Sequence, residues 1–204
     1  MSTIENVNKN ILTSYLSAAF ATQLFWIVSF SILTALAAQI TVPVKPVPFT
    51  MQTFMVLLAG AFLGARNGAL SQILYLMMGV IGLPVFAQTP DGLIGIARIF
   101  GPTGGYLLSF PLAAFFAGYF IEKNKSYLST ILSMFAANIF ILLFGSLYLG
   151  LFFRGGILEG IKLGAAIFSI WMVIKVFLAA SLFASSSDKY KKLPPNNSKF
   201  INDK

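Results

Sequence analysis

The stretch LSTILSMFAANIFILLFGSLYLGLF, from Leu128 to Phe152, runs for 25 residues without a charged side chain. About 20 apolar residues are enough for an α-helix to cross the ~30 Å hydrocarbon core of a bilayer. A transmembrane β-barrel would need alternating apolar and polar residues, and this stretch does not alternate. The sequence therefore predicts an all-α integral membrane protein.

Five further apolar stretches extend this prediction over the chain. The composition agrees, because 57% of the 204 residues are hydrophobic and only 10% are charged. The second stretch in chain order, Thr53 to Leu63, is too short to span a bilayer by itself. We expect it to be tilted, kinked or buried against its neighbours. The six predicted transmembrane helices are Phe20 to Ile40, Thr53 to Leu63, Ala69 to Val85, Gly104 to Ile121, Leu128 to Phe152 and Ile161 to Leu182.

The predicted membrane domain covers residues 20–184 as one unit. A polar segment, residues 1–19, precedes it and has no short apolar core ending in a cleavage site, so we expect no removed signal peptide. A basic tail, residues 185–204, follows and is rich in Lys, Asn, Pro and Ser. We expect this tail to be partly disordered.

The formal net charge of +8 is scattered among the predicted loops, which argues against a nucleic-acid partner. With six spans, both termini share one side. That side holds nine basic residues: Lys9, Arg66, Lys123, Lys125, Lys189, Lys191, Lys192, Lys199 and Lys204. The opposite loops hold four: Lys45, Arg98, Arg154 and Lys162. The positive-inside rule therefore predicts a plasma-membrane protein with both termini in the cytoplasm.

The chain contains no cysteine and no histidine. This excludes disulfides, thiolate metal sites and cysteine nucleophiles, and it removes the commonest metal ligand and acid–base group. We predict no metal site, no cofactor and no catalytic residue. A membrane-embedded enzyme acting on lipid is an alternative function, but the predicted spans also lack paired carboxylates.

The longest predicted loop, FAQTPDGLIGIARIFGPTGGY from Phe86 to Tyr106, is rich in glycine and proline. Such backbone is tolerated at membrane depth only when it is buried in protein or lines a cavity. The charge count places this loop outside, and its apolar residues predict an extracellular lid that folds back onto the helices. These residues are Leu93, Ile94, Ile96, Ile99 and Phe100.

The motif GPTGGY, Gly101 to Tyr106, stands at the start of the fourth predicted helix. It is not a phosphate loop, because no Lys and Ser/Thr follow the last glycine. Free N–H groups at a helix start can receive a carbonyl or carboxylate, and glycine permits close approach of a ligand. The alternative is chain punctuation, in which the motif only turns the chain and caps the helix. The candidate ligand-binding residues here are Gly101, Thr103, Gly104, Gly105 and Tyr106.

Lys175 lies near the middle of the last predicted span, FSIWMVIKVFLAASLFA. An ionised side chain at a bilayer centre costs ~2.5–3.5 kcal/mol. No acidic residue lies one turn away in either direction. We expect Lys175 to face an anionic ligand or Asp91 from the lid, with snorkelling toward the interface as the alternative.

Weaker candidates come from polar residues in or beside the apolar stretches. Gln52, Gln72 and Asn138 could contact a ligand, and interhelical hydrogen bonds explain them equally well. Asp91 could be an ordinary solvated turn residue. In the first helix, Ser31 and Ala35 form a small-xxx-small step that permits close helix approach, either to a docking partner or within the chain.

Four stretches of the sequence resemble the BioY biotin transporters, the substrate-binding (S) components of energy-coupling factor importers. They are AQITVPVKPVPFTMQTF, LLAGAFLGARNGALSQILYLMMGVIGLPVFA, the Gly-rich lid and GPTGGYLLSFPLAAFFAGYF, which together cover about Ala38 to Phe120. The resemblance implies a six-helix membrane fold that binds biotin near the outer face. It also implies an energy-coupling transmembrane protein and ATPase subunits as partners for biotin uptake.

The resemblance also suggests roles for individual positions. It places Gln52 on the family's Thr-x-Gln-Thr element, Asp91 near the polar residue of the lid, Gly101 to Tyr106 on the GPTGGY element and Lys175 on the last-helix lysine. The family usually has Pro-Gly-Asp-x-x-Lys in the last helix, whereas Met172 stands three residues before the lysine here. A degenerate relative that binds another small vitamin or a biotin precursor is therefore the alternative function.

Overall fold

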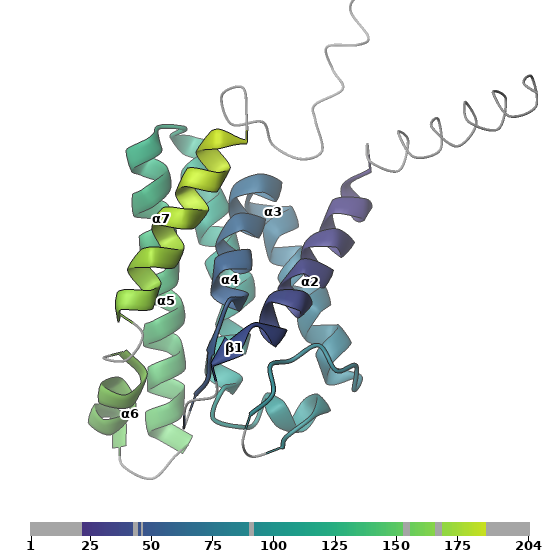
Figure 1. The fold of residues 1–204 in the computed structure, drawn as a ribbon, viewed down its shortest axis with the longest axis vertical. Coiled ribbons are helices and arrows are strands. Elements are labelled where there is room, and N and C mark those ends of the chain that lie inside the picture. Colours follow the sequence, from purple (N-terminus) through teal and green to yellow (C-terminus); the bar gives the residue numbers. More distant parts are fainter. Residues whose placement is uncertain are drawn as a thin grey trace, which may run out of the picture.

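The computed structural model describes residues 22–42, 45, 47–89, 92–152, 156–165 and 169–186. These residues form a helical bundle with a small two-stranded sheet beside it (Figure 1). The helices are α2 (Gln23–Gln39), α3 (Gln52–Val80), α4 (Gly104–Lys123), α5 (Tyr127–Phe152), α6 (Gly156–Ala165) and α7 (Ser169–Ser185). Strands β1 (Thr41–Val42) and β2 (Phe49–Thr50) pair antiparallel, and a 3₁₀ turn, η1 (Gly95–Arg98), precedes α4.

Three helices of the described part, α3, α4 and α5, are long and apolar enough to cross a membrane. The shorter helices α2 and α7 are also apolar. The outward faces of these five helices together are rich in exposed Leu, Ile and Phe, as expected where lipid replaces water as the solvent. The prediction of a helical membrane protein is confirmed, except that an all-α fold does not include the short β1–β2 sheet.

Helix α3 is a tight helical hairpin. Gly64 adopts φ 77° and ψ −179°, a backbone conformation essentially restricted to glycine. Near this turn, a Cβ added to Gly68 would lie 2.9 Å from the Cα of Gly60. At the far ends of the two halves, Gln52 donates a hydrogen bond to Tyr75. The two halves of α3 therefore run antiparallel.

These halves correspond to two of the predicted spans, Thr53 to Leu63 and Ala69 to Val85. The predicted loop between them, Leu63 to Gly68, is instead helical except at Gly64. The first half is buried over Val56–Ala61, which agrees with the expectation that a span this short is covered by its neighbours. A single glycine thus replaces a whole interhelical loop.

Close glycine contacts join the α3 hairpin to α4. A Cβ added to Gly60 would lie 2.4 Å from the carbonyl oxygen of Ala114, and one added to Gly118 would lie 2.4 Å from the backbone nitrogen of Ala65. The backbones approach this closely only because no side chain intervenes. This packing makes the α3–α4 unit the most tightly joined part of the bundle.

Gly60→Val is expected to lower the free energy of unfolding by about 1–3 kcal/mol or more, because the new side chain meets backbone atoms that cannot yield. The measurement is the melting temperature in detergent. Ala136→Val is the matched control, since Ala136 is exposed on α5. Equal melting temperatures for the two variants would contradict the tight contact.

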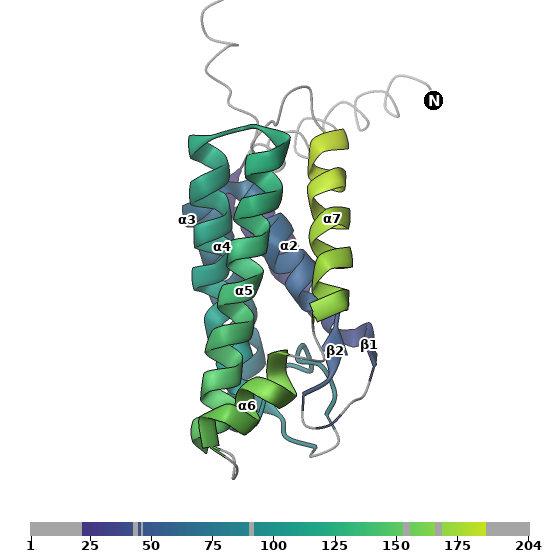
Figure 2. The same cartoon turned by 90° about the vertical axis from the view of Figure 1, so that its left-hand side faces the viewer.

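The last predicted span, Ile161 to Leu182, is two helices rather than one. Helix α6 ends at Ala165 and α7 begins at Ser169. Helix α6 lies across the end of α5 (Figure 2), where a Cβ added to Gly160 would lie 2.5 Å from the nitrogen of Gly150. The predicted start of the first span, at Phe20, lies outside the described residues, and α2 begins at Gln23.

The bundle has two chemically different ends. At one end lie the Gly64 turn and the short connection between α4 and α5, which are linked by a hydrogen bond from the Ala65 nitrogen to the Glu122 carboxylate at 3.4 Å. At the other end lie the β1–β2 sheet, residues 81–103 as far as they are described, and α6. The predicted polar segment 1–19 and most of the basic tail lie outside the described residues. The candidate site lies at the sheet end.

Candidate small-molecule site

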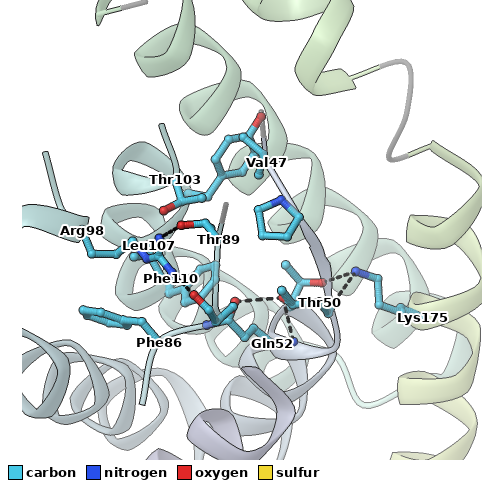
Figure 3. A pocket seen from close by; sticks show the side chains of 14 residues that line it. Val47, Thr50, Gln52, Phe86, Thr89, Arg98, Thr103, Leu107, Phe110 and Lys175 are labelled. Atoms are coloured by element: carbon cyan, nitrogen blue, oxygen red, sulfur yellow. Dashed lines mark hydrogen bonds between the residues drawn. The ribbon is translucent and has the colours of Figure 1, made fainter. Parts of the chain in front are cut away.

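A small cavity of about 50 Å³ lies where the sheet meets α3, α4 and α7 (Figure 3). One part of its wall is apolar: Val47, Pro48, Phe86, Ala87, Leu107 and Phe110. Polar side chains form the rest: Thr50, Gln52, Thr53, Thr89, Arg98, Thr103, Tyr106 and Lys175. An apolar wall with a few convergent polar groups is typical of a small-molecule binding site.

Helix α7 brings Lys175 to this cavity from a distant part of the sequence. The side chain is only 5% exposed. Its Nζ donates hydrogen bonds to the Thr53 hydroxyl at 2.6 Å and to the Thr50 carbonyl at 3.3 Å (Figure 3). Both acceptors are neutral, and no carboxylate of the described residues pairs with Lys175. The ammonium points into the bundle, which contradicts snorkelling and leaves a buried positive charge beside the cavity.

Gln52, at the start of α3, is held in one orientation by its neighbours. Its Oε1 accepts a hydrogen bond from the Thr50 hydroxyl at 2.8 Å, and its Nε2 donates to the hydroxyl of Tyr75. The Tyr75 hydroxyl in turn donates to the Val85 carbonyl at 3.2 Å. A continuous hydrogen-bond chain thus joins β2 to the segment that enters the cavity wall at Phe86.

Arg98 is a site residue that sequence reasoning missed, because it was counted only as a loop charge. It is 3% exposed and lines the cavity. One guanidinium nitrogen donates to the Thr89 hydroxyl and another to the Ala87 carbonyl. Its planar fork therefore fastens segment 87–89 to η1. The available signal was an arginine within an apolar, glycine-rich loop, where a charge near membrane depth needs partners.

The start of α4 contributes Thr103 and Tyr106. Thr103 is buried against the cavity, and its hydroxyl has no hydrogen-bond partner among the described residues. It forms no side-chain cap on α4, contrary to the punctuation alternative. The Tyr106 ring lines the cavity, and its hydroxyl lies 3.3 Å from the Ser146 hydroxyl. The free hydroxyl of Thr103 is therefore available to a ligand.

The glycines of the motif do not line the cavity. A Cβ added to Gly104 would lie 1.7 Å from the carbonyl oxygen of Ile99, and one added to Gly105 would lie 2.2 Å from Cβ of Tyr148. Both glycines therefore permit close packing of the chain, in place of the predicted ligand approach. Gly101 is also absent from the lining, and a Cβ there would meet a methyl of Leu93 at 2.7 Å.

Asp91, the remaining candidate, lies outside the described residues. The predicted apolar attachment of the lid is partly wrong, because Ile94 is 80% exposed and Phe100 is 71% exposed. The segment is attached instead through Arg98 and through the Ile99 carbonyl, which accepts a hydrogen bond from Tyr148 at 2.9 Å. Polar contacts therefore hold this loop together with the packing of Phe86 and Ile99 against the core.

Ser31 and Ala35, the candidate docking residues of the first helix, pack within the bundle. Ser31 is fully buried and donates a hydrogen bond to the Ser71 carbonyl of α3 at 2.6 Å, so it cannot be presented to a docking partner. Ala35 is half-buried and packs against the core. Gln72 donates to Ser71 and to a threonine of α2, which confirms the interhelical reading. Asn138 is buried on α5 and does not line the cavity.

A larger hollow of about 440 Å³ adjoins the cavity and includes residues 92–95 of the glycine-rich loop. The two spaces share Phe86, Ala87, Thr89 and Arg98 as wall residues. A displacement of segment 86–89 would therefore join the two spaces. In the structure, this segment separates the cavity from the larger hollow.

These features define a class: a helical membrane protein with a buried cationic cavity for a small molecule at one end of its bundle. A sequence model described as the BioY family matches residues 7–192. The "Biotin transporter BioY" of Thermotoga maritima is 37% identical over 151 residues, which cover 74% of this chain and 87% of that protein. The chain belongs to the BioY family. The relative named here carries the name of a transporter, not of an enzyme.

Two further relatives match over shorter segments. The "Probable biotin transporter BioY" of Pyrococcus horikoshii is 46% identical over 105 residues, 52% of this chain and 62% of that protein. The protein of the same name from Lysinibacillus sphaericus is 47% identical over 103 residues, 50% of each. The matching region thus spans about half to three-fifths of these two proteins.

The fold is also that of a solved protein. The crystal structure of the S-component for biotin from an ECF-type ABC transporter superposes with a TM-score of 0.74. The alignment covers 82% of this chain and 93% of that one, at 22% sequence identity. At this identity the likeness establishes the fold.

Proposed function

We propose that this protein takes up biotin, which it binds at the cavity from the outer side of the plasma membrane. The observation that supports this most strongly is Lys175, a buried cation whose hydrogen-bond acceptors are neutral. Biotin has a carboxylate that can neutralise such a charge. A buried ammonium that gains an anionic partner in a dry site loses much of its desolvation penalty.

The ureido ring and the apolar surface of biotin also match the residues that line the cavity. Its ureido ring has two N–H donors and a carbonyl acceptor, which match the hydroxyl of Thr103 and the remaining amide N–H of Gln52. Its hydrocarbon and thioether surface can pack against Phe86, Leu107 and Phe110. Met172 packs against the core and does not line the cavity, so the ligand must be recognised without the family's usual carboxylate there.

Binding requires the cavity to enlarge. A volume of about 50 Å³ is far below the ~300 Å³ of ordinary ligand pockets. We propose that the glycine-rich loop is the extracellular lid, and that segment 86–89 moves with it to join the cavity to the adjoining 440 Å³ hollow. Arg98 then fastens the segment again over the bound ligand.

We propose six membrane crossings: α2, the two halves of α3, α4, α5 and α7. The end with the Gly64 turn faces the cytoplasm and the sheet end faces outward. Arg66, Lys123 and Lys125 are exposed at the first end. Arg98 is buried and does not act as a loop charge, so the described outer end exposes only Lys45 and Lys162. This imbalance supports the positive-inside assignment.

Uphill import needs an energy source, and we propose the family's module of a coupling membrane protein and ATPase subunits. The test is uptake of labelled biotin by bacterial cells that lack biotin import and synthesis. Cells with this chain and its module should accumulate biotin, and excess unlabelled biotin should compete better than desthiobiotin, thiamine or riboflavin. Uptake equal to that of empty cells, with both components in the membrane, would refute the proposal.

A further inference from the structure

An open groove of about 470 Å³ lies at the opposite end of the bundle, between the end of α4 and the first half of α5. It shares no residue with the cavity. The function proposed above makes no use of it. Its lining changes character along its length, from polar at the bundle end to apolar toward the middle.

The mouth of the groove offers hydrogen-bond donors and a positive charge. Lys123 lies over the ring of Tyr119, 4.4 Å from its centroid, and pairs with no carboxylate of the described residues. The Ser126 oxygen accepts from the Ser129 nitrogen at 3.1 Å, which leaves its own hydroxyl hydrogen for another acceptor. The side-chain oxygen of Asn124 accepts a hydrogen bond from the Ser126 nitrogen, which leaves the side-chain amide hydrogens for another acceptor. Such a set of donors fits a phosphate group.

The floor of the groove is apolar and exposed. Leu128, Leu132 and Ala136 follow one another at four-residue intervals and so line one face of α5. Leu128 is 65% and Leu132 is 60% exposed, and Phe120 of α4 borders them. From the mouth at Ser126 to Ala136, the helix rises by about 15 Å. This equals about half of the ~30 Å hydrocarbon thickness, which is the depth of one leaflet.

We propose that this groove binds a phospholipid with an anionic headgroup. The phosphate lies at Lys123 and the Ser126 hydroxyl, and one acyl chain lies along the leucine face of α5. Anionic lipids bind in preference to zwitterionic ones, because three cations are exposed at this end of the bundle: Lys123, Lys125 and Arg66. Each cation near an anionic membrane surface contributes ~1 kcal/mol. The bound lipid fixes the depth of the α4–α5 end in its leaflet.

The test is native mass spectrometry of the delipidated full chain, titrated with phosphatidylglycerol or with phosphatidylcholine of the same chains. Phosphatidylglycerol should bind more tightly. Lys123→Gln should lower its affinity about fivefold, which corresponds to ~1 kcal/mol, and should lower the affinity for phosphatidylcholine less, because the choline cation already offsets the charge of that phosphate. Lys162→Gln at the other end is the matched control and should change neither affinity, since Lys162 is exposed beside Glu159.

Leu132→Trp tests the acyl-chain site without a change of charge. Leu132 is exposed, so the larger side chain fills the groove rather than the core, and the affinity for both lipids should fall. Equal affinity for the two lipids, or wild-type binding by both groove variants, would overturn the proposal. Glycerol phosphate binding as tightly as the lipid would show a phosphate site without a chain and would overturn it too. Biotin titration of the same variants should be unchanged, which separates this proposal from the proposed function.

Discussion

Lys175→Met is expected to weaken biotin binding by roughly 30- to 1000-fold, or about 2–4 kcal/mol, the range for truncating one partner of a buried charge pair. The variant removes the cation beside the cavity and nearly preserves the volume of the side chain. The melting temperature in detergent should stay equal or rise, because the substitution also removes the desolvation penalty of a buried ammonium. Calorimetric titration with biotin, together with a melting curve, measures both effects.

The control for this variant is Lys162→Met, which removes an exposed lysine of α6 and should bind biotin as the wild type does. The uncharged methyl ester of biotin adds a second test. The wild type should bind the acid much more tightly than the ester, whereas Lys175→Met should bind the two almost equally. Wild-type affinity for the acid in Lys175→Met would mean that this lysine holds α7 to Thr50 and Thr53 without contacting the ligand.

Arg98→Met is expected to weaken biotin binding by about 30- to 100-fold, or ~2–3 kcal/mol. The loss follows because the Thr89 hydroxyl and the Ala87 carbonyl lose a charged donor, and buried acceptors left without one cost ~1–3 kcal/mol. Arg98→Lys should recover only part of the affinity, because an ammonium cannot reproduce the planar fork. Calorimetry measures the affinities, and limited proteolysis reports whether the loop before α4 loosens.

Arg66→Met is the matched control, since Arg66 is exposed at the other end of the bundle. It should leave both biotin affinity and the proteolysis pattern unchanged. If Arg98→Met bound biotin as tightly as the wild type, segment 86–89 would not be the closing wall of the site. A loss of affinity in Arg66→Met of the same size would show that general positive charge, rather than the local fork, governs binding.

The sequence predicted the membrane class and most helices because apolar length is a local property. Leu128–Phe152 differs from the observed α5 by one residue at its start. The break between α6 and α7 was missed because the residues from Leu163 to Ile174 carry no charge across it. A connection between the second and third spans was predicted, but its tight turn at Gly64 alone was not, since a glycine with positive φ looks the same in a sequence as any other.

The site was only partly predictable for a related reason. Lys175 stood out because a charge in an apolar span conflicts with its local surroundings. Arg98 did not stand out, because a loop arginine is ordinary until the fold buries it. Gly104 and Gly105 were assigned to a ligand, and only the three-dimensional structure shows that Ile99 and Tyr148 occupy the space beside them. Whether a glycine serves packing or binding is decided by neighbours distant in sequence.

Calorimetric titration of the purified full chain with biotin decides whether the Lys175 cavity is a biotin site. We predict saturable binding of one biotin per chain, with loss of affinity in Lys175→Met and in Arg98→Met but not in Lys162→Met. Absence of saturable binding by folded wild-type protein, or the same affinity in all four proteins, would contradict it.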